Sequence, residues 1–306
     1  MNAETAKTLC RINNDFYRNH HAAFSKTRER PWQGWRRCLD VVKRDLLEEQ
    51  PSYAGKRQGY AGEQPSYAEG RPSYAGERSS YAGERQDASE DGISYRKTQQ
   101  SLVVFDIACG NLRFERFLES ELPETSLTFY AVDNCDGIVP QMPNVTYQSL
   151  DILVELTEGH PLIGLLKSPA CDLSVSFGFM HHIPFQEQRV EVLSTLIRQT
   201  RPGGLVIVSF WQFLNDEALS VKAQMTHERA LSELRAQGIL LDNLDEGDFL
   251  LGWENKPGAY RYCHSFSEAE IERLVESVAD KAIVVSRFAA DGRTGNLNTY
   301  LILRVL

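Results

Sequence analysis

Residues 101–118, SLVVFDIACGNLRFERFL, constrain the fold of this chain more than any other segment. An apolar run ends in Asp106, a turn of small residues follows through Gly110, and an amphipathic helical pattern begins after it. This succession predicts the first strand, turn and helix of a doubly wound α/β domain. In such a domain the ligand binds at the carboxyl ends of the strands, and an acid there favours amine or hydroxyl donors.

The segments after residue 118 continue the α/β alternation. Further strands are predicted at 127–133, 144–151, 171–179 and 205–211, with RPGG (201–204) as a turn and helices at 112–121, 186–200 and 216–237. A capping box at Ser267–Glu270 predicts the start of a last helix. The segments 282–288 and 298–305 predict an antiparallel closing pair.

Composition divides the chain into three parts: an N-terminal helical arm (1–50), a repeat insert (51–98) and an α/β domain (99–306). The insert repeats SYAGER-type units, with a tyrosine every seven residues from Tyr53 to Tyr81. Each unit carries one aromatic residue among frequent glycine and proline, too little apolar surface to offset chain entropy. We therefore predict that the insert is disordered and that it is either a flexible tether or a neutral expansion of a tolerant loop.

The net charge of −9 is distributed unevenly. Ten basic and three acidic residues lie between Lys7 and Arg44, whereas 16 basic and 28 acidic residues lie between 101 and 306. Two interpretations remain open for the arm: it holds an anionic partner at one face, or it is a basic, solvated helix surface. Its interleaved aromatic residues predict either a cover over the ligand site or a helical cap packed on the core.

Several classes of protein are not expected. The sequence contains no run of 18 apolar residues, so no membrane-spanning helix is predicted. The first residues, MNAETAKTLC, do not resemble a signal peptide. The six cysteines are scattered without a CxxC pair, which favours reduced thiols over disulfides or a zinc site. We expect a cytoplasmic protein that binds no membrane and no metal.

Three acids end three successive predicted strands: Asp106, Asp133 and Asp151. Strand ends of a doubly wound sheet line one crevice, so the three carboxylates are expected to face one ligand. Asp133 lies 23 residues beyond Gly110, where an acid binds ribose hydroxyls in nucleoside sites. Asp151 would reach an adenine amino group and Asp106 an ammonium group, which favours a nucleoside that carries an amino acid. The absent G-x-G-x-x-G fingerprint argues against a dinucleotide.

This pattern resembles the class I S-adenosylmethionine-dependent methyltransferases. The chain is more narrowly similar to the tRNA methyltransferases that esterify 5-carboxymethyluridine at the wobble position. The resemblance covers residues 9–50 and 101–306 and rests on these motifs: FSKTRERPW, FDIACGN, VDNCDGI, SFGFMHHIPFQEQRVEVL, RPGGLVIVSFWQ, DFLLGW, YRYCHSFSEAEIERLV and NTYLIL. It implies a Rossmann-like seven-stranded sheet and S-adenosyl-L-methionine as cofactor. It also implies tRNA bound through the basic arm, and a small partner subunit as in related eukaryotic enzymes.

The resemblance also implies the site residues. Those expected to bind the cofactor are Asp106, Ala108, Gly110, Asn111, Asp133, Asn134, Asp151, Ile152 and Phe177. Those expected to hold a carboxylate acceptor are Arg28, His181, His182, Arg261 and Asn298. Trp32, Trp211 and Trp253 are candidates to stack on a base or, equally, to be core or lid residues.

The first turn departs from the family, because Ala108 and Leu112 stand where glycines are usual. Glycine at such positions permits a positive φ and a close backbone approach, so cofactor affinity is the property that the change affects. Three functions remain open: a tRNA wobble-uridine methyltransferase, a small-molecule methyltransferase acting on a quinone or carboxylate metabolite, and a non-catalytic module that kept the fold.

Overall fold

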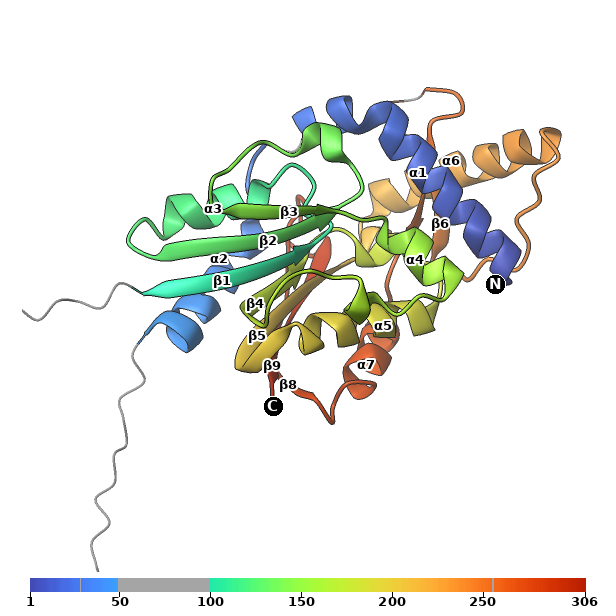
Figure 1. Cartoon of the computed structure of the whole chain (residues 1–306). Coiled ribbons are helices and arrows are strands. Elements are labelled where there is room, and N and C mark those ends of the chain that lie inside the picture. Colours follow the sequence, from blue (N-terminus) through green and yellow to red (C-terminus); the bar gives the residue numbers. More distant parts are fainter. Residues whose placement is uncertain (28, 49–99, 255) are drawn as a thin grey trace, which may run out of the picture. The chain divides into compact units, whose positions relative to one another are not determined.

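A seven-stranded sheet organises the protein, in the order β3-β2-β1-β4-β5-β9-β8 (Figure 1). The computed structural model describes residues 1–27, 29–48, 100–254 and 256–306, so the predicted repeat insert lies outside the described residues. The strands are β1 (Ser101–Ile107), β2 (Ser126–Asp133), β3 (Val145–Ser149), β4 (Cys171–Ser176), β5 (Thr200–Trp211), β8 (Ala282–Ala290) and β9 (Asn298–Val305). β1 to β5 are parallel, and β9 is antiparallel to both β5 and β8.

This arrangement confirms the predicted doubly wound sheet and its antiparallel closing pair. Helices cover both faces: α2 (Gln33–Val42) and α3 (Arg113–Glu121) pack on one face, and α4 (Ile152–Glu158), α5 (Gln186–Arg198) and α7 (Glu268–Glu276) pack on the other. Leu102 and Val104 of β1 face the first pair of helices, whereas Phe105 and Ile107 face the second group. The two-residue alternation of a strand explains why one apolar run supplies both cores.

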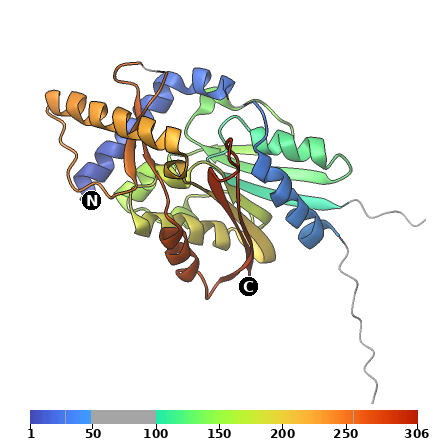
Figure 2. The same cartoon turned by 180° about the vertical axis from the view of Figure 1, so that it is seen from behind.

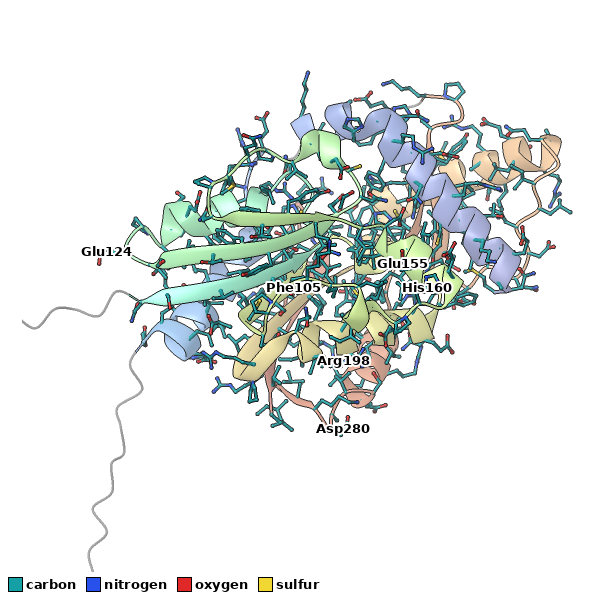
Figure 3. All side chains as sticks on the ribbon, in the orientation of Figure 1. Phe105, Glu124, Glu155, His160, Arg198 and Asp280 are labelled. Carbon is teal, nitrogen blue, oxygen red and sulfur yellow. The ribbon has the colours of Figure 1, made fainter. Side chains whose placement is uncertain are left out.

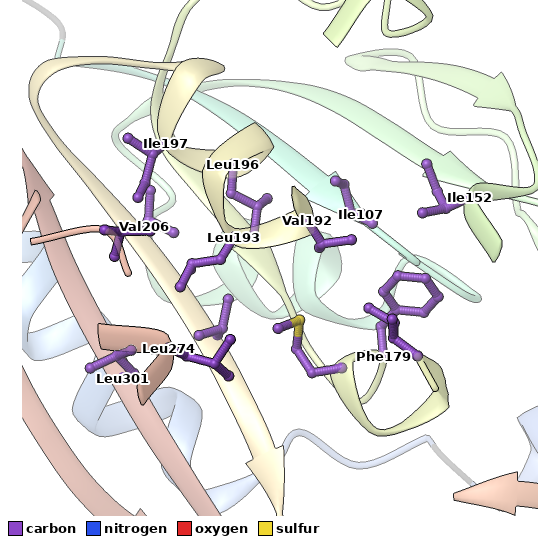
Figure 4. Packing of buried hydrophobic residues seen from close by; sticks show 14 of the residues in the cluster. Ile107, Ile152, Phe179, Val192, Leu193, Leu196, Ile197, Val206, Leu274 and Leu301 are labelled. Carbon is purple, nitrogen blue, oxygen red and sulfur yellow. The ribbon is translucent and has the colours of Figure 1, made fainter. Parts of the chain in front are cut away.

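The core beneath α5 and α7 is the larger of the two (Figure 4). Leu193 and Leu196 of α5 and Leu274 of α7 meet Val206 and Leu301 of the sheet, and all are fully buried. Figure 3 shows the complementary distribution, with Phe105 inside the molecule and exposed charged side chains such as Glu124 and Asp280 at its periphery.

A second, two-stranded sheet pairs β6 (Asp248–Gly252) with β7 (Tyr260–His264). It packs with the long helices α1 (Ala3–Lys26) and α6 (Glu217–Ala236), as the two opposite views show (Figures 1 and 2). The sequence pattern did not predict these strands, because β7 is buried at every position and lacks an alternating pattern. None of the helices in the described part of the chain is long and apolar enough to cross a membrane.

Two predicted boundaries were wrong. RPGG was expected to be a turn, but β5 begins at Thr200 and includes it, with an irregularity in its pairing to β4 and a positive φ at Gly203. β4 ends at Ser176 rather than at residue 179, so Phe177 lies in the loop that follows. The loop is turned there by Gly178, whose φ is 71°.

The N-terminal arm is fastened to the closing strands at the start of α2. Gly34 N–H donates to Asp291 Oδ1 (3.1 Å), while Tyr300 O–H and Asn298 Nδ2 donate to Asp291 Oδ2 (2.6 and 2.9 Å). Trp35 on the same helix is 2% exposed and packs against Phe114 and Phe117 of α3. The arm is therefore an integral layer of the α/β domain.

Gly34→Ala tests this attachment, because a Cβ at residue 34 would lie 2.2 Å from Cε2 of Tyr300. We expect the free energy of unfolding to fall by about 1–3 kcal/mol, measured by chemical denaturation. Gly164→Ala is the matched control, since a Cβ there meets nothing within 4 Å. Equal stability of the two variants would contradict the attachment.

Candidate functional site

A cavity of about 760 Å³ opens at the carboxyl ends of the parallel strands, bounded by α1 and by the segment that joins α1 to α2. The described site residues that the sequence predicted all line this one cavity: Asp106, Ala108, Gly110, Asn111, Asp133, Asn134, Asp151, Ile152, Phe177, His181, His182, Arg261 and Asn298. Arg28 lies outside the described residues. The cavity has the size of a typical small-molecule or cofactor site.

The turn after β1 has the positive φ angles that glycine favours, although two of the three residues concerned are not glycines. Ala108 and Leu112 have φ angles of 65° and 56°, and Gly110 between them has 57°. A left-handed conformation costs a residue with a side chain about 1–2 kcal/mol. The fully buried Leu112 side chain offsets that cost by packing beneath the turn. Residues 108, 110 and 112 therefore all have a positive φ, although only residue 110 is a glycine.

Asp133, at the end of β2, has both carboxylate oxygens fixed by the backbone. Gly110 N–H donates to Oδ2 and Cys135 N–H donates to Oδ1, each at 2.9 Å. Burial raises the pKa of Asp133, although these N–H groups oppose the shift by favouring the charged form. The backbone N–H of Asn134 also hydrogen-bonds to this carboxylate, and the acceptor capacity that remains is suited to a hydroxyl group.

Asp151 is more fully engaged. Its Oδ1 accepts from Val154 N–H (3.1 Å) and so begins α4, while its Oδ2 accepts from the amides of Asn14 (2.8 Å) and Asn134 (2.9 Å). Asn14 belongs to α1, so Asp151 fastens the arm over the cavity. The binding of an adenine amino group by Asp151 stays a prediction.

α1 makes a second contact with the predicted motif residues, since Asn111 Nδ2 donates to Ser25 Oγ (2.8 Å). The sequence pattern did not indicate Asn14 or Ser25, because an isolated polar residue on an amphipathic helix carries no signal of a distant partner. The N-terminal arm lies over the cavity, as one of the two interpretations of its sequence predicted.

The two histidines after β4 are both buried. His182 Nδ1 lies 2.9 Å from the carbonyl oxygen of Tyr262, and its Nε2 lies 2.8 Å from Tyr17 Oη of α1. His181 packs against Trp211, with ring centroids 5.1 Å apart. Cys263 lies beside both histidines, and the atoms of these three residues that could bind a metal ion lie within 4.8 Å of one another. Because both His182 nitrogens contact protein groups, His182 is held in one orientation by the fold.

Arg261 extends from β7 into the cavity and is 9% exposed. Its guanidinium carbon lies 5.7 Å from the ring centroids of both Phe16 and Trp211 and 6.0 Å from that of Trp253. Three aromatic rings thus surround a cation at the cavity wall, an arrangement that restricts hydration of the guanidinium and strengthens its attraction for an anion. Trp32 and Trp211 line the cavity, whereas Trp253 contacts Arg261 without being among the described lining residues.

A buried charge network supports β7 from behind. His264 lies between two carboxylates, with Nδ1 2.7 Å from Asp248 Oδ1 and Nε2 2.9 Å from Glu270 Oε1. Tyr262 O–H also donates to Asp248 (2.7 Å). Burial raises the pKa of Glu270, but the bonds from His264 and Ser267 outweigh it and lower the value to about 2.

Two charged residues at or near the cavity were not predicted as site residues from the sequence. Arg113 lies over Trp32 and Trp35, 5.2 and 4.9 Å from their ring centroids, and burial lowers its pKa to about 10. Glu115, fully buried behind the cavity wall, adjoins Asp106. Both read in the sequence as ordinary charged positions on the exposed face of a helix.

Comparison with known proteins yields partial similarities, and no family model matches the chain. A mouse protein, tRNA (carboxymethyluridine(34)-5-O)-methyltransferase ALKBH8, is 25% identical over 131 residues, which are 43% of this chain and 18% of the mouse protein. The chain therefore spans about a fifth of that relative's length.

Solved structures of methyltransferases also resemble the chain. An S-adenosylmethionine-dependent methyltransferase from Methanosarcina mazei is 16% identical and covers 68% of this chain and 94% of its own, with a TM-score of 0.46. The N-methyltransferase NodS from Bradyrhizobium japonicum, in complex with S-adenosyl-l-homocysteine, is 11% identical and covers 67% and 78%, with a TM-score of 0.39. The seven-stranded fold that the sequence predicted is the one observed.

Glu270→Gln tests the support of β7. The depressed pKa of Glu270 stabilises the fold above about pH 4.5, and this contribution is lost as the pH falls toward 2. We expect the variant to lose about 2 kcal/mol at pH 7, and the difference from the wild type to narrow in acid. Denaturation curves between pH 2.5 and 7 measure both effects.

Glu276→Gln, at the exposed end of the same helix, is the control and is expected to change stability by less than about 0.5 kcal/mol. A stability difference for Glu270→Gln that stays constant with pH would show that its charge is not the stabilising feature.

Proposed function

We propose that this protein is an S-adenosylmethionine-dependent methyltransferase whose acceptor is the carboxylate of a carboxymethyl-type modified uridine at the wobble position of tRNA. The observation that carries the proposal is the convergence in one cavity of two unlike groups of residues. Carboxylates at the ends of β1 and β2 suit the cofactor, and a buried arginine from β7 suits an anionic acceptor. The partial similarity to the mouse wobble-uridine enzyme supports the same acceptor.

The residues at the strand ends fit the cofactor. Asp133, held in place by backbone N–H groups, keeps acceptor capacity for a ribose hydroxyl. Asp106, which lines the cavity and is 4% exposed, offers a carboxyl group to the ammonium of the amino-acid portion. The left-handed turn at 108–112 exposes backbone without a bulky side chain, because Leu112 points into the core. When bound, S-adenosylmethionine supplies an electrophilic methyl group on a sulfonium.

The acceptor side needs positioning rather than a base. A carboxylate is already ionised near pH 7 and attacks through an oxygen lone pair, so no proton has to be removed. Arg261 would bind that carboxylate through its guanidinium, in a wall of three aromatic rings that excludes water. Holding acceptor and methyl donor in line is worth roughly 7–11 kcal/mol of the barrier.

The supporting residues have distinct tasks in this proposal. His181 and His182 shape the loop after β4, and Tyr17 fixes the His182 ring from the arm. Trp32 lines the cavity beside Gly178, where a Cβ would lie 3.0 Å from the indole, so a flat base has an aromatic surface to stack upon. Asn298 lines the cavity as well and donates a hydrogen bond to Asp291.

The arm supports a polynucleotide acceptor. Lys7, Arg11, Lys26 and Arg30 are exposed on its described residues, and Lys26 and Arg30 reach the cavity mouth. Cations placed beside the entrance would bind phosphates that flank a base inserted into the cavity.

Mass spectrometry of tRNA nucleosides tests the proposed acceptor. We expect purified protein with S-adenosylmethionine to convert carboxymethyl-type wobble uridine to its methyl ester in tRNA that carries the carboxymethyl group without the ester, with activity falling steeply as salt rises because phosphate contacts release counterions. Transfer that survives RNase treatment of a metabolite pool would instead favour a small carboxylate acceptor. No transfer to either pool would favour a binding module without activity.

Arg261→Ala separates acceptor binding from cofactor binding. We expect kcat/KM for methyl transfer to fall at least roughly a hundredfold, because the carboxylate loses its buried counter-charge. The dissociation constant of S-adenosylhomocysteine, measured by calorimetry, should stay within about twofold of the wild type. Asp133→Ala is the converse control, since it should weaken S-adenosylhomocysteine. Loss of cofactor affinity in Arg261→Ala would overturn the assignment of Arg261.

A further inference from the structure

Two carboxyl groups adjoin each other at the base of the cavity, and the proposed reaction uses only one of them. Asp106 is the penultimate residue of β1 and lines the cavity, whereas Glu115 lies in the first turn of α3 and is fully buried. Among the described residues, no donor hydrogen-bonds to Asp106 Oδ1, and the carboxyl group of Glu115 contacts its own backbone N–H. An ionised carboxylate without donors is costly in a protein interior, so this arrangement requires a proton or a cation.

The surroundings of the pair are predominantly negative. Asp133 on β2 adds negative charge, and the Cys109 thiol in the turn stays neutral because burial raises its pKa. Arg116 on α3 provides a positive charge that favours ionised Glu115. Two carboxylates in such a site do not both ionise at neutral pH.

We propose that Asp106 and Glu115 share a proton in the free protein and release it to solvent when the ammonium group of the cofactor binds against Asp106. This inference rests on the proposed cofactor. Before binding, a carboxyl of one residue donates its proton to the carboxylate of the other. After binding, the ammonium N–H groups donate to Asp106, its charge replaces that of the proton, and the proton leaves. Glu115 is thus a positioning residue that acts through Asp106.

The titration behaviour of the pair agrees with this exchange. Burial raises the pKa of Glu115 to about 7, and burial and the adjacent Glu115 raise that of Asp106 well above its usual range. Because the bound state holds fewer protons, affinity for a cationic ligand should rise with pH and level off once the pair has lost its proton in the free protein. The affinity cannot rise by more than a factor of ten per pH unit for each proton released.

Calorimetry of S-adenosylhomocysteine binding to the full chain tests the proposal. At pH 6.5, in buffers of different ionisation enthalpy, the binding enthalpy reports the number of protons released. We expect the wild type to release about half a proton or more. 5′-Methylthioadenosine, which lacks the amino-acid portion, should bind without release, and this comparison requires no variant.

Glu115→Gln should abolish proton release and flatten the dependence of affinity on pH, because its amide can donate to an ionised Asp106. Glu119→Gln, an exposed position of the same helix, is the matched control and should behave as the wild type. Binding of S-adenosylhomocysteine without proton release, or equal release with 5′-methylthioadenosine, would overturn the inference alone. Absence of any S-adenosylhomocysteine binding would overturn the proposed cofactor, and this inference with it.

Discussion

The gathering of carboxyl groups at the carboxyl ends of β1, β2 and β3 is the constraint on which the rest of the site depends. Each carboxylate is balanced by a different means. Backbone N–H groups fix Asp133, the amides of Asn14 and Asn134 satisfy Asp151, and Asp106, whose Oδ1 has no donor among the described residues, adjoins Glu115. The first two solutions rigidify the cavity, since each carboxylate joins separate segments. The third leaves a local deficit of positive charge where a cationic ligand is expected.

The arm is as much a part of this balance as the sheet. It supplies Asn14 to Asp151 and Tyr17 to His182, and the start of α2 is fixed by Asp291. A long insertion between the arm and β1 is compatible with such docking, because closing a loop costs only about 0.6 kcal/mol more for each doubling of its length. Contacts on the cavity side and on the sheet side fix the arm independently of how the chain connects them.

Local patterns in the sequence predicted the sheet and its strand-end acids, because a buried parallel strand and the residue that ends it are adjacent in the chain. They did not predict β7, whose five buried residues alternate neither in polarity nor in size. They also did not indicate Asn14 or Glu115, whose roles come from partners on other elements. The altered turn illustrates the same limit, since Ala108 and Leu112 depart from the usual glycines and yet both have a positive φ.

The two sides of the cavity are formed by different segments of the chain. Contiguous strand–turn segments hold the side that suits the cofactor, whereas Trp32, Arg261 and Asn298, on the acceptor side, come from the arm and from the last strands. Substitutions in those later segments can alter the acceptor without disturbing the cofactor side. In the proposed function, the guanidinium of Arg261, flanked by aromatic rings, would favour a negatively charged acceptor over a neutral one.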